Sequence, residues 1–148
     1  MFEGLAMSAV LAAQNPTLQK IELAAPKAQL SLEVARTEQQ REDGLMDRTV
    51  LPPHTGMIFV FGDDGSQSFW MKDTLVPLDM VFVAADGSVR KVFARVPVLR
   101  SGLTDAQIPL ESAAAKYVIE LPAGEAAADG LAPGVKLDVA GVPAALDR

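Results

Sequence analysis

Apolar and polar residues follow a two-residue period early in the chain and form short apolar runs later. Leu30, Leu32 and Val34 alternate with polar or small residues, as in a half-buried strand. Residues 57–61 are a nearly unbroken apolar run between two glycines, and this length and these flanks favour a core strand. Four further extended segments are predicted, at 18–23, 68–72, 116–121 and 135–139.

Turn signals divide these predicted strands. Segments 80–84 and 88–96 flank Asp86 and Gly87, a dipeptide typical of a type I′ hairpin turn in which both central residues take positive φ. Residues 62–66 are predicted as a second turn. Residues 97–115 contain two prolines and a glycine and are predicted as one long connection, of the length found in functional or mobile loops.

Helix signals are few and short. Thr37 and Gln40 have the spacing of a capping box, and Gly44 can end the helix, which predicts a helix over 38–43. The alanine-rich segment 123–129 predicts a second short helix. Because no segment is long enough for the crossover helices of a parallel sheet, we expect a mainly β domain, a barrel or a compact sandwich with one or two short helices.

The length of 148 residues and the hydrophobic share of 49% are those of one domain with a real core. We expect residues 17–141 to form it, with 142–148 as a tail. Residues 1–16 contain an apolar run too short to span a membrane and without the basic residues that begin an intact signal peptide. A trimmed signal would mean a periplasmic or otherwise exported protein, whereas a disordered or helical leader fits a cytoplasmic one.

Composition excludes several classes of partner and chemistry. With 19 acidic and 13 basic residues the net charge is -6, and no basic cluster is present, so we expect no nucleic-acid partner. The absence of Cys excludes disulfides, thiolate nucleophiles and Cys-bound zinc. A single histidine, His54, excludes a two-His metal site and is predicted as an exposed turn residue. We expect no metal, no cofactor and a monomer.

The segment 69–74 carries the only Trp of the chain together with charged residues. In an extended backbone Phe69 and Met71 share one face, and Trp70 and Lys72 the other. If the first pair joins the core, the second pair can line a cleft, where an indole stacks on a flat ligand. The alternative is structural, with Trp70 covering one end of the barrel and Lys72 lying along it.

Polar residues near this segment complete the candidate ligand site. Asp79 enters a predicted strand among apolar residues, so its carboxylate needs a partner, and we expect Arg48 or Lys72. The alternative is an acid/base pair of Asp79 with Asp73 or Glu120. No nucleophile elbow, phosphate loop or His-based triad is present, so no catalytic residue is assigned. The candidate ligand-binding residues are Arg48, Trp70, Lys72, Asp73, Thr74, Asp79 and Glu120.

Four ordered blocks resemble the domain of unknown function 192 family. They are Gly44-Leu45-Met46-x-Arg48, Gly56-Met57-x-Phe59-x-Phe61, Phe69-Trp70-Met71-Lys72-Asp73-Thr74-x-x-Pro77-Leu78-Asp79 and Tyr117-Val118-Ile119-Glu120-Leu121-Pro122-Ala123-Gly124. The resemblance implies a small, mainly β, barrel-like domain of bacteria and archaea, often behind a signal sequence and without an established activity. The family usually has Asn at the position of Asp73.

Three functional hypotheses follow. The first is a non-catalytic, exported binding or accessory domain for a small polar or saccharide-like ligand. The second is a hydrolase that uses Asp79 with Lys72 or Glu120. The third is a protein-interaction module, in which Trp70 and the loop 97–115 form an exposed apolar patch.

Overall fold

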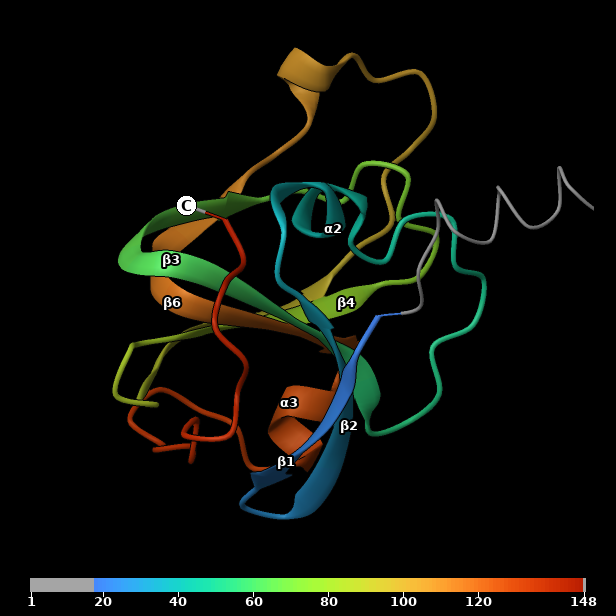
Figure 1. The fold of residues 1–148 in the computed structure, drawn as a ribbon. Helices are drawn as coiled ribbons and strands as arrows, with labels where there is room; N and C mark the ends of the chain where they lie inside the picture. Colours follow the sequence, from blue (N-terminus) through green and yellow to red (C-terminus); the bar gives the residue numbers. More distant parts are fainter. Residues whose placement is uncertain (1–17, 148) are drawn as a thin grey trace, which may run out of the picture.

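A computed structural model describes residues 18–147, which form one six-stranded sheet with two short helices and one turn of 3-10 helix (Figure 1). The expected mainly β fold is confirmed. The predicted leader, 1–16, lies outside the described residues. The elements are β1 (Lys20–Ala25), β2 (Ala28–Ala35), α2 (Glu38–Asp43), β3 (Thr55–Phe69), β4 (Leu78–Val83), β5 (Val89–Val96), η1 (Asp105–Gln107), β6 (Glu111–Pro122) and α3 (Glu125–Ala128).

The sheet has the strand order β1-β2-β3-β6-β4-β5, and β2 and β3 are its parallel pair. The other neighbouring strands are antiparallel. The edge strands β1 and β5 do not pair with each other in the described part of the chain, so the sheet is open and does not close into a barrel. Of these described helices, none is both long and apolar enough to cross a bilayer.

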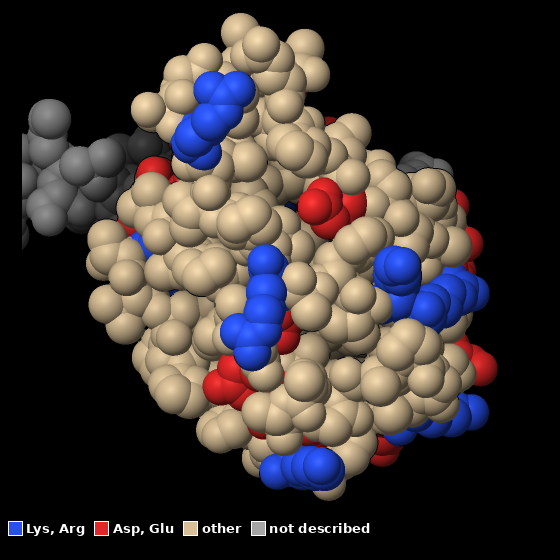
Figure 2. All heavy atoms as spheres, turned by 180° about the vertical axis from the view of Figure 1, so that it is seen from behind, with Lys and Arg blue, Asp and Glu red and all other residues tan. Residues whose placement is uncertain are grey.

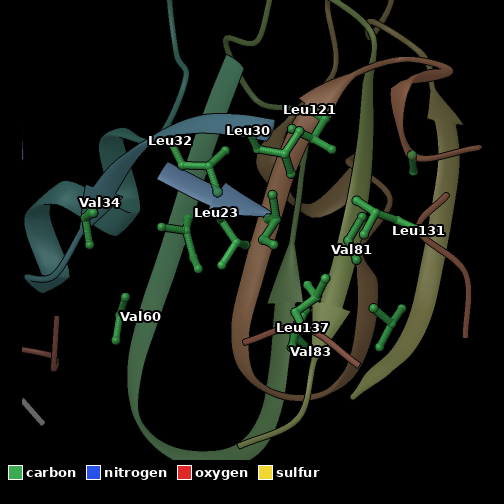
Figure 3. Close-up of a cluster of buried hydrophobic side chains, with 14 residues drawn as sticks. Leu23, Leu30, Leu32, Val34, Val60, Val81, Val83, Leu121, Leu131 and Leu137 are labelled. Atoms are coloured by element: carbon green, nitrogen blue, oxygen red, sulfur yellow. The ribbon is translucent and has the colours of Figure 1, made fainter. Parts of the chain in front are cut away.

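One face of the sheet curls around an aliphatic core (Figure 3). Leu30 and Leu32 from β2 and Val81 and Val83 from β4 belong to one cluster, together with Ile58 of β3 and Ile119 of β6, the two strands between them in the sheet. One apolar face thus continues across the open sheet from β2 to β4. Helix α3 packs on this face through its buried Ala126.

The other face carries an aromatic core. Phe69 packs edge-on against Phe59 and Phe82, with ring centroids 4.8 and 5.7 Å apart. Met57 and Met80 lie beside these rings and are fully buried. Edge-to-face packing of this kind contributes stability beyond the area that it buries.

The short helix α2 has the bounds that the capping box predicts. The Thr37 side chain accepts a hydrogen bond from the Gln40 N–H at 3.1 Å, and the Gln40 side chain accepts one from the Thr37 N–H at 3.2 Å. The N–H of Gly44 donates to the Gln40 carbonyl at 2.9 Å, with φ of 45° at the glycine. Because α2 buries no residue of its own, these local bonds determine where it begins and ends.

Two predicted boundaries inside the sheet are wrong. The expected turn at 62–66 lies within β3, which continues to Phe69 with a register shift between Val60 and Gly65. Pairing with β6, which begins at Glu111 and not at residue 116, carries the strand through this polar stretch. The long connection is therefore shorter than predicted. A β-bulge absorbs the residues that locally resemble a turn.

The hairpin between β4 and β5 forms, but with a different turn from the predicted one. Positive φ is found at Gly87 (93°) and not at Asp86, and the Gly87 N–H donates to the Ala84 carbonyl at 2.9 Å. This is the three-residue type, in which a glycine follows an ordinary turn.

Residues 135–139 do not form a strand. They make one isolated bridge, between Ser88 and Lys136. In addition, the Leu137 N–H donates to the Gly87 carbonyl and the Val135 carbonyl accepts from the Val89 N–H, both at 2.8 Å. The segment after Gly141, expected as a tail, contacts the domain: the Leu146 N–H donates to the Arg36 carbonyl at 2.9 Å, and Asp147 pairs with Arg41 at 2.8 Å.

Candidate functional site

A pocket of about 320 Å³ opens beside α2, on the aromatic face of the sheet. Its walls come from α2 and the loop that follows it, from β3, from the segment after β3 and from β6. The lining residues are Glu38, Arg41, Glu42, Asp43, Gly44, Leu45, Met46, Phe59, Phe61, Ser68, Phe69, Trp70, Lys72, Thr74 and Glu120.

Glu120 is the buried acid of this pocket. It occupies the central strand β6 between Met57 of β3 and Met80 of β4, where an apolar residue would be expected, and is only 5% exposed. Burial raises the pKa of its carboxyl group to about 8. Within residues 18–147 no hydrogen bond or ion pair to this carboxyl is found. At neutral pH it is therefore mainly protonated and can both donate and accept a hydrogen bond.

A close approach of two strands fixes the surroundings of Glu120. A Cβ atom added at Gly56 would lie 1.9 Å from the Glu120 carbonyl oxygen, so only glycine fits in β3 at this point. The contact sets the register in which Met57 faces Glu120. Gly56 thus supports the strand pairing around Glu120, although it does not line the pocket.

Trp70, Lys72 and Thr74 form one side of the pocket. The predicted orientation is confirmed, because Phe69 and Met71 are buried in the aromatic core while Trp70 and Lys72 are half-buried. The Lys72 ammonium lies 5.3 Å from the Trp70 ring centroid and 3.0 Å from the Asp105 carboxylate of η1. The buried Thr74 hydroxyl donates to the Lys72 carbonyl at 3.2 Å, which fixes this turn.

Helix α2 forms the facing side. Its exposed acids Glu38, Glu42 and Asp43 reach the pocket together with Arg41. The Arg41 guanidinium is already engaged: it donates to the Val60 carbonyl at 3.0 Å, pairs with Asp147 and lies 5.3 Å from the Phe61 ring centroid. Both cationic side chains of the pocket thus have partners, whereas the buried acid has none among the described residues.

Asp79 lies on the opposite face of the sheet and does not line the pocket. Its fully buried carboxylate accepts hydrogen bonds from the backbone N–H groups of Arg95 (2.8 Å), Gly124 (3.0 Å) and Ala126 (2.8 Å). The predicted pairing with Arg48 or Lys72 is wrong, because backbone N–H groups from distant parts of the sequence satisfy the carboxylate instead.

The strand register also separates Asp79 from Glu120. Asp79 is opposite Leu121 and Met80 is opposite Glu120, so the two acids point to different faces. An acid/base pair of Asp79 and Glu120 is therefore incompatible with the fold.

Two other predicted residues also lie outside this pocket. Arg48 pairs with Glu33 at 2.6 Å beside a separate cavity of about 190 Å³. Asp73 is exposed with φ of 52°, and its carbonyl accepts a hydrogen bond from the Asp47 N–H at 2.8 Å. Of the seven candidate residues, the structure brings together Trp70, Lys72, Thr74 and Glu120.

Comparison with known proteins gives a family but no activity. Residues 20–139 match DUF192, a family described as "Uncharacterized ACR". The chain belongs to the DUF192 family. No curated protein matches it significantly.

Two solved structures resemble this DUF192 domain. A protein from Sinorhizobium meliloti 1021, named as a candidate transcription regulator, has a TM-score of 0.74 and 31% identity, over 84% of this chain and 96% of its own. A protein of unknown function from Novosphingobium aromaticivorans DSM 12444 has a TM-score of 0.69 and 29% identity, over 82% of this chain and 84% of its own.

The contribution of α2 to the DUF192 pocket could not be predicted from side-chain chemistry alone. The sequence of α2 is polar on all sides, which indicates an exposed helix. For this reason its acidic residues were not predicted as part of the site. The available signal was the block Gly44-Leu45-Met46, whose Leu45 enters the aromatic core and thereby holds the end of α2 over the pocket.

Proposed function

We propose that this DUF192 protein is a non-catalytic binding or accessory domain that holds a small polar or saccharide-like ligand in the pocket beside α2. The observation that carries the proposal is the Glu120 carboxyl group, buried at the pocket and without a partner among the described residues. Placing a polar group in an apolar core costs stability unless it is satisfied. A ligand that hydrogen-bonds to Glu120 would offset this cost.

The size and chemistry of the pocket support a small neutral ligand. Its volume of about 320 Å³ is at the lower end of ligand pockets, which are roughly 300–1,000 Å³. A protonated Glu120 can donate to and accept from hydroxyl groups, and the Trp70 indole offers an apolar surface for a sugar ring. Because Lys72 and Arg41 are already paired with acids, an anionic ligand is disfavoured.

Export to the periplasm is part of the same proposal. It rests on the apolar run within residues 1–13 and on the frequent signal sequences that the family resemblance implies. Detection of the protein in the periplasmic fraction of its bacterium, with the chain shortened at its start, is the expected result. Recovery of the full chain from the cytoplasmic fraction would contradict it.

We do not propose a role in transcription regulation for this chain, although the Sinorhizobium relative is named for one. The net charge is -6, and on the face drawn in Figure 2 basic and acidic side chains are dispersed among uncharged ones. Binding to nucleic acid depends on a basic surface. We therefore keep the prediction of no nucleic-acid partner, and that of a monomer.

The hydrolase alternative retains one supporting observation. A carboxyl group with a pKa raised to about 8 is a suitable general acid. Its proposed partners are lost, because Asp79 lies on the other face and Lys72 is paired with Asp105. The interaction-module alternative is supported by the exposed Val98 and Leu110 in the loop between β5 and β6.

Trp70 fluorescence tests the binding proposal directly, because no other Trp contributes to the signal. The chain is titrated with neutral mono- and disaccharides, amino sugars, nucleotides and short peptides. We expect a saturable change in Trp70 emission with at least one neutral saccharide, and no hydrolysis product by chromatography. A product would support the hydrolase alternative.

Two variants identify the pocket as the site of binding. Glu120→Leu fills the same position without hydrogen bonding and should abolish the saturable change. Glu22→Gln, at an exposed position of β1, is the matched control and should bind as the unaltered chain does. A flat response to every ligand class, or equal binding by both variants, would refute the proposal.

A further inference from the structure

A second group of polar side chains lies away from the pocket, where α3 meets the loop before β3. His54 ends this loop, while Glu125 begins α3 and Asp129 caps its C-terminus. Their ligand atoms all lie within 4.8 Å of one another. The His54 Nδ1 atom is 3.2 Å from Glu125 Oε2 and 3.2 Å from Asp129 Oδ1.

The two carboxylates are poorly satisfied by the protein. Asp129 is 2% exposed, and its carboxylate lies 3.4 Å from His54 Nδ1 and within hydrogen-bonding reach of the Glu125 carboxyl group. Glu125 Oε1 accepts the His54 backbone N–H at 2.9 Å, but the buried Oε2 has no hydrogen bond. Burial and the neighbouring Asp129 raise the pKa of Glu125. Two such carboxyl groups side by side repel each other when both are ionised, unless a shared proton or a bound cation lies between them.

The two distances from His54 Nδ1, 3.2 Å to each carboxylate, match those between ligands of one metal ion. Donor atoms bound at about 2.1 Å in tetrahedral or octahedral geometry lie roughly 3.0–3.4 Å apart. An imidazole has at most one hydrogen on Nδ1, so it can form only one well-directed hydrogen bond to the two carboxylates, which lie in different positions. One imidazole nitrogen with two carboxylate oxygens is a donor set that suits zinc and related transition metals.

We propose that His54, Glu125 and Asp129 bind a divalent transition-metal ion such as Zn²⁺. The ion joins the loop before β3 to α3, on the sheet face opposite the pocket. The His54 side chain is 51% exposed, so water can reach the ion and complete its coordination. A single histidine excludes a site with two His ligands. It does not exclude this site, which has one His and two carboxylate ligands.

The untagged full chain is titrated with Zn²⁺ and, separately, with Co²⁺, Ca²⁺ and Mg²⁺. Because His54 is the sole histidine, its imidazole proton resonances are assigned without ambiguity. We expect these resonances to change until one equivalent of Zn²⁺ has bound, Co²⁺ to develop a visible absorption band that Zn²⁺ displaces, and Zn²⁺ to raise the Tm. Ca²⁺ and Mg²⁺ should bind much more weakly, since imidazole is a poor ligand for hard cations.

Variants assign the binding to these side chains. His54→Asn removes the imidazole but tolerates the observed φ of 60°, and Asp129→Asn removes one carboxylate at constant size. Each should weaken Zn²⁺ binding by at least about 100-fold. Mutation of residues that only hydrogen-bond to a metal ligand already lowers metal affinity by roughly 10–100-fold, and loss of a ligand itself should cost more. Asp63→Asn, an exposed position in β3, is the control and should bind normally.

Two results would overturn the proposal. One is the absence of saturable Zn²⁺ binding to the unaltered chain. The other is equal Zn²⁺ affinity in His54→Asn and Asp63→Asn. His54 is exposed, so His54→Asn decides the matter even if Asp129→Asn fails to fold.

Discussion

Asp79 and Glu120 are buried carboxylic acids on neighbouring strands, but they differ in their hydrogen-bond partners. Asp79, at 0% exposure, accepts three backbone N–H groups and connects β4 to β5 and to the start of α3. Glu120, at 5% exposure, faces a pocket and has no partner among the described residues. The difference shows that burial alone does not distinguish a structural acid from a candidate ligand-binding acid. The distinguishing feature is whether other protein groups satisfy the hydrogen-bonding capacity of the carboxyl group.

The largest expected effect is that of removing the Asp79 carboxylate. Asp79→Ala leaves three backbone N–H groups without their acceptor, one buried and two partly buried. An unsatisfied group costs about 1–3 kcal/mol, with the lower values expected for the two partly buried ones, so we expect a loss of roughly 3–5 kcal/mol in the free energy of unfolding. Urea unfolding followed by circular dichroism measures it. Because the typical total is only about 5–15 kcal/mol, the variant should be close to unfolding at 37 °C.

Asp79→Asn is the companion variant and separates hydrogen bonding from packing. It retains one acceptor oxygen at nearly constant volume, so its loss should lie between zero and that of Asp79→Ala. Losses below about 1 kcal/mol in both variants would mean that the three N–H groups find other partners, and the structural role assigned to Asp79 would be incorrect.

Glu120 should make stability depend on pH in a defined direction. Its folded pKa is raised from 4.5 to about 8, so its protonated form favours the folded state. This stabilisation of the folded state is fully present below about pH 4.5 and is lost as pH rises toward 8. The free energy of unfolding should fall by at most about 1.4 kcal/mol per pH unit, and by a few kcal/mol in total. Urea unfolding at several pH values measures this decline.

Glu120→Gln is the control, because an amide keeps the shape and does not ionise. The difference in unfolding free energy between the variant and the unaltered chain should grow in favour of the variant as pH rises from 5 to 8. Taking this difference removes titration shared by both proteins, such as that of Glu125, whose pKa is also raised. A difference that does not vary with pH would show that Glu120 is solvated in the folded protein.

The smallest expected effect is the coupling between the two acids. Asp79 and Glu120 share no hydrogen-bond partner and lie on different faces, so the losses from Asp79→Asn and Glu120→Gln should add within about 0.5 kcal/mol. A double-mutant cycle in urea at pH 6 measures the coupling. A coupling energy above about 1 kcal/mol would show that the two carboxyl groups interact, and the acid/base pair of Asp79 and Glu120 would again be a candidate.

Much of the fold was already determined by local sequence. The capping box of Thr37 and Gln40 fixed the bounds of α2, because both hydrogen bonds lie within one turn. The alternation at Leu30, Leu32 and Val34 predicted the buried face of β2, and the pattern at Phe69 to Lys72 predicted which side chains enter the core. These features depend on neighbours a few residues away, which the sequence contains directly.

Tertiary structure alone decided the extent of β3, the partner of Asp79 and the composition of the pocket. β3 crosses an apparent turn because β6 offers it pairing partners some 50 residues away. Asp79 is satisfied by N–H groups of Arg95, Gly124 and Ala126, which no spacing rule connects to it. Which face of a strand meets which neighbour depends on register, and register is fixed by contacts between distant segments. The sequence therefore named Glu120 as a candidate, and the fold separated it from Asp79.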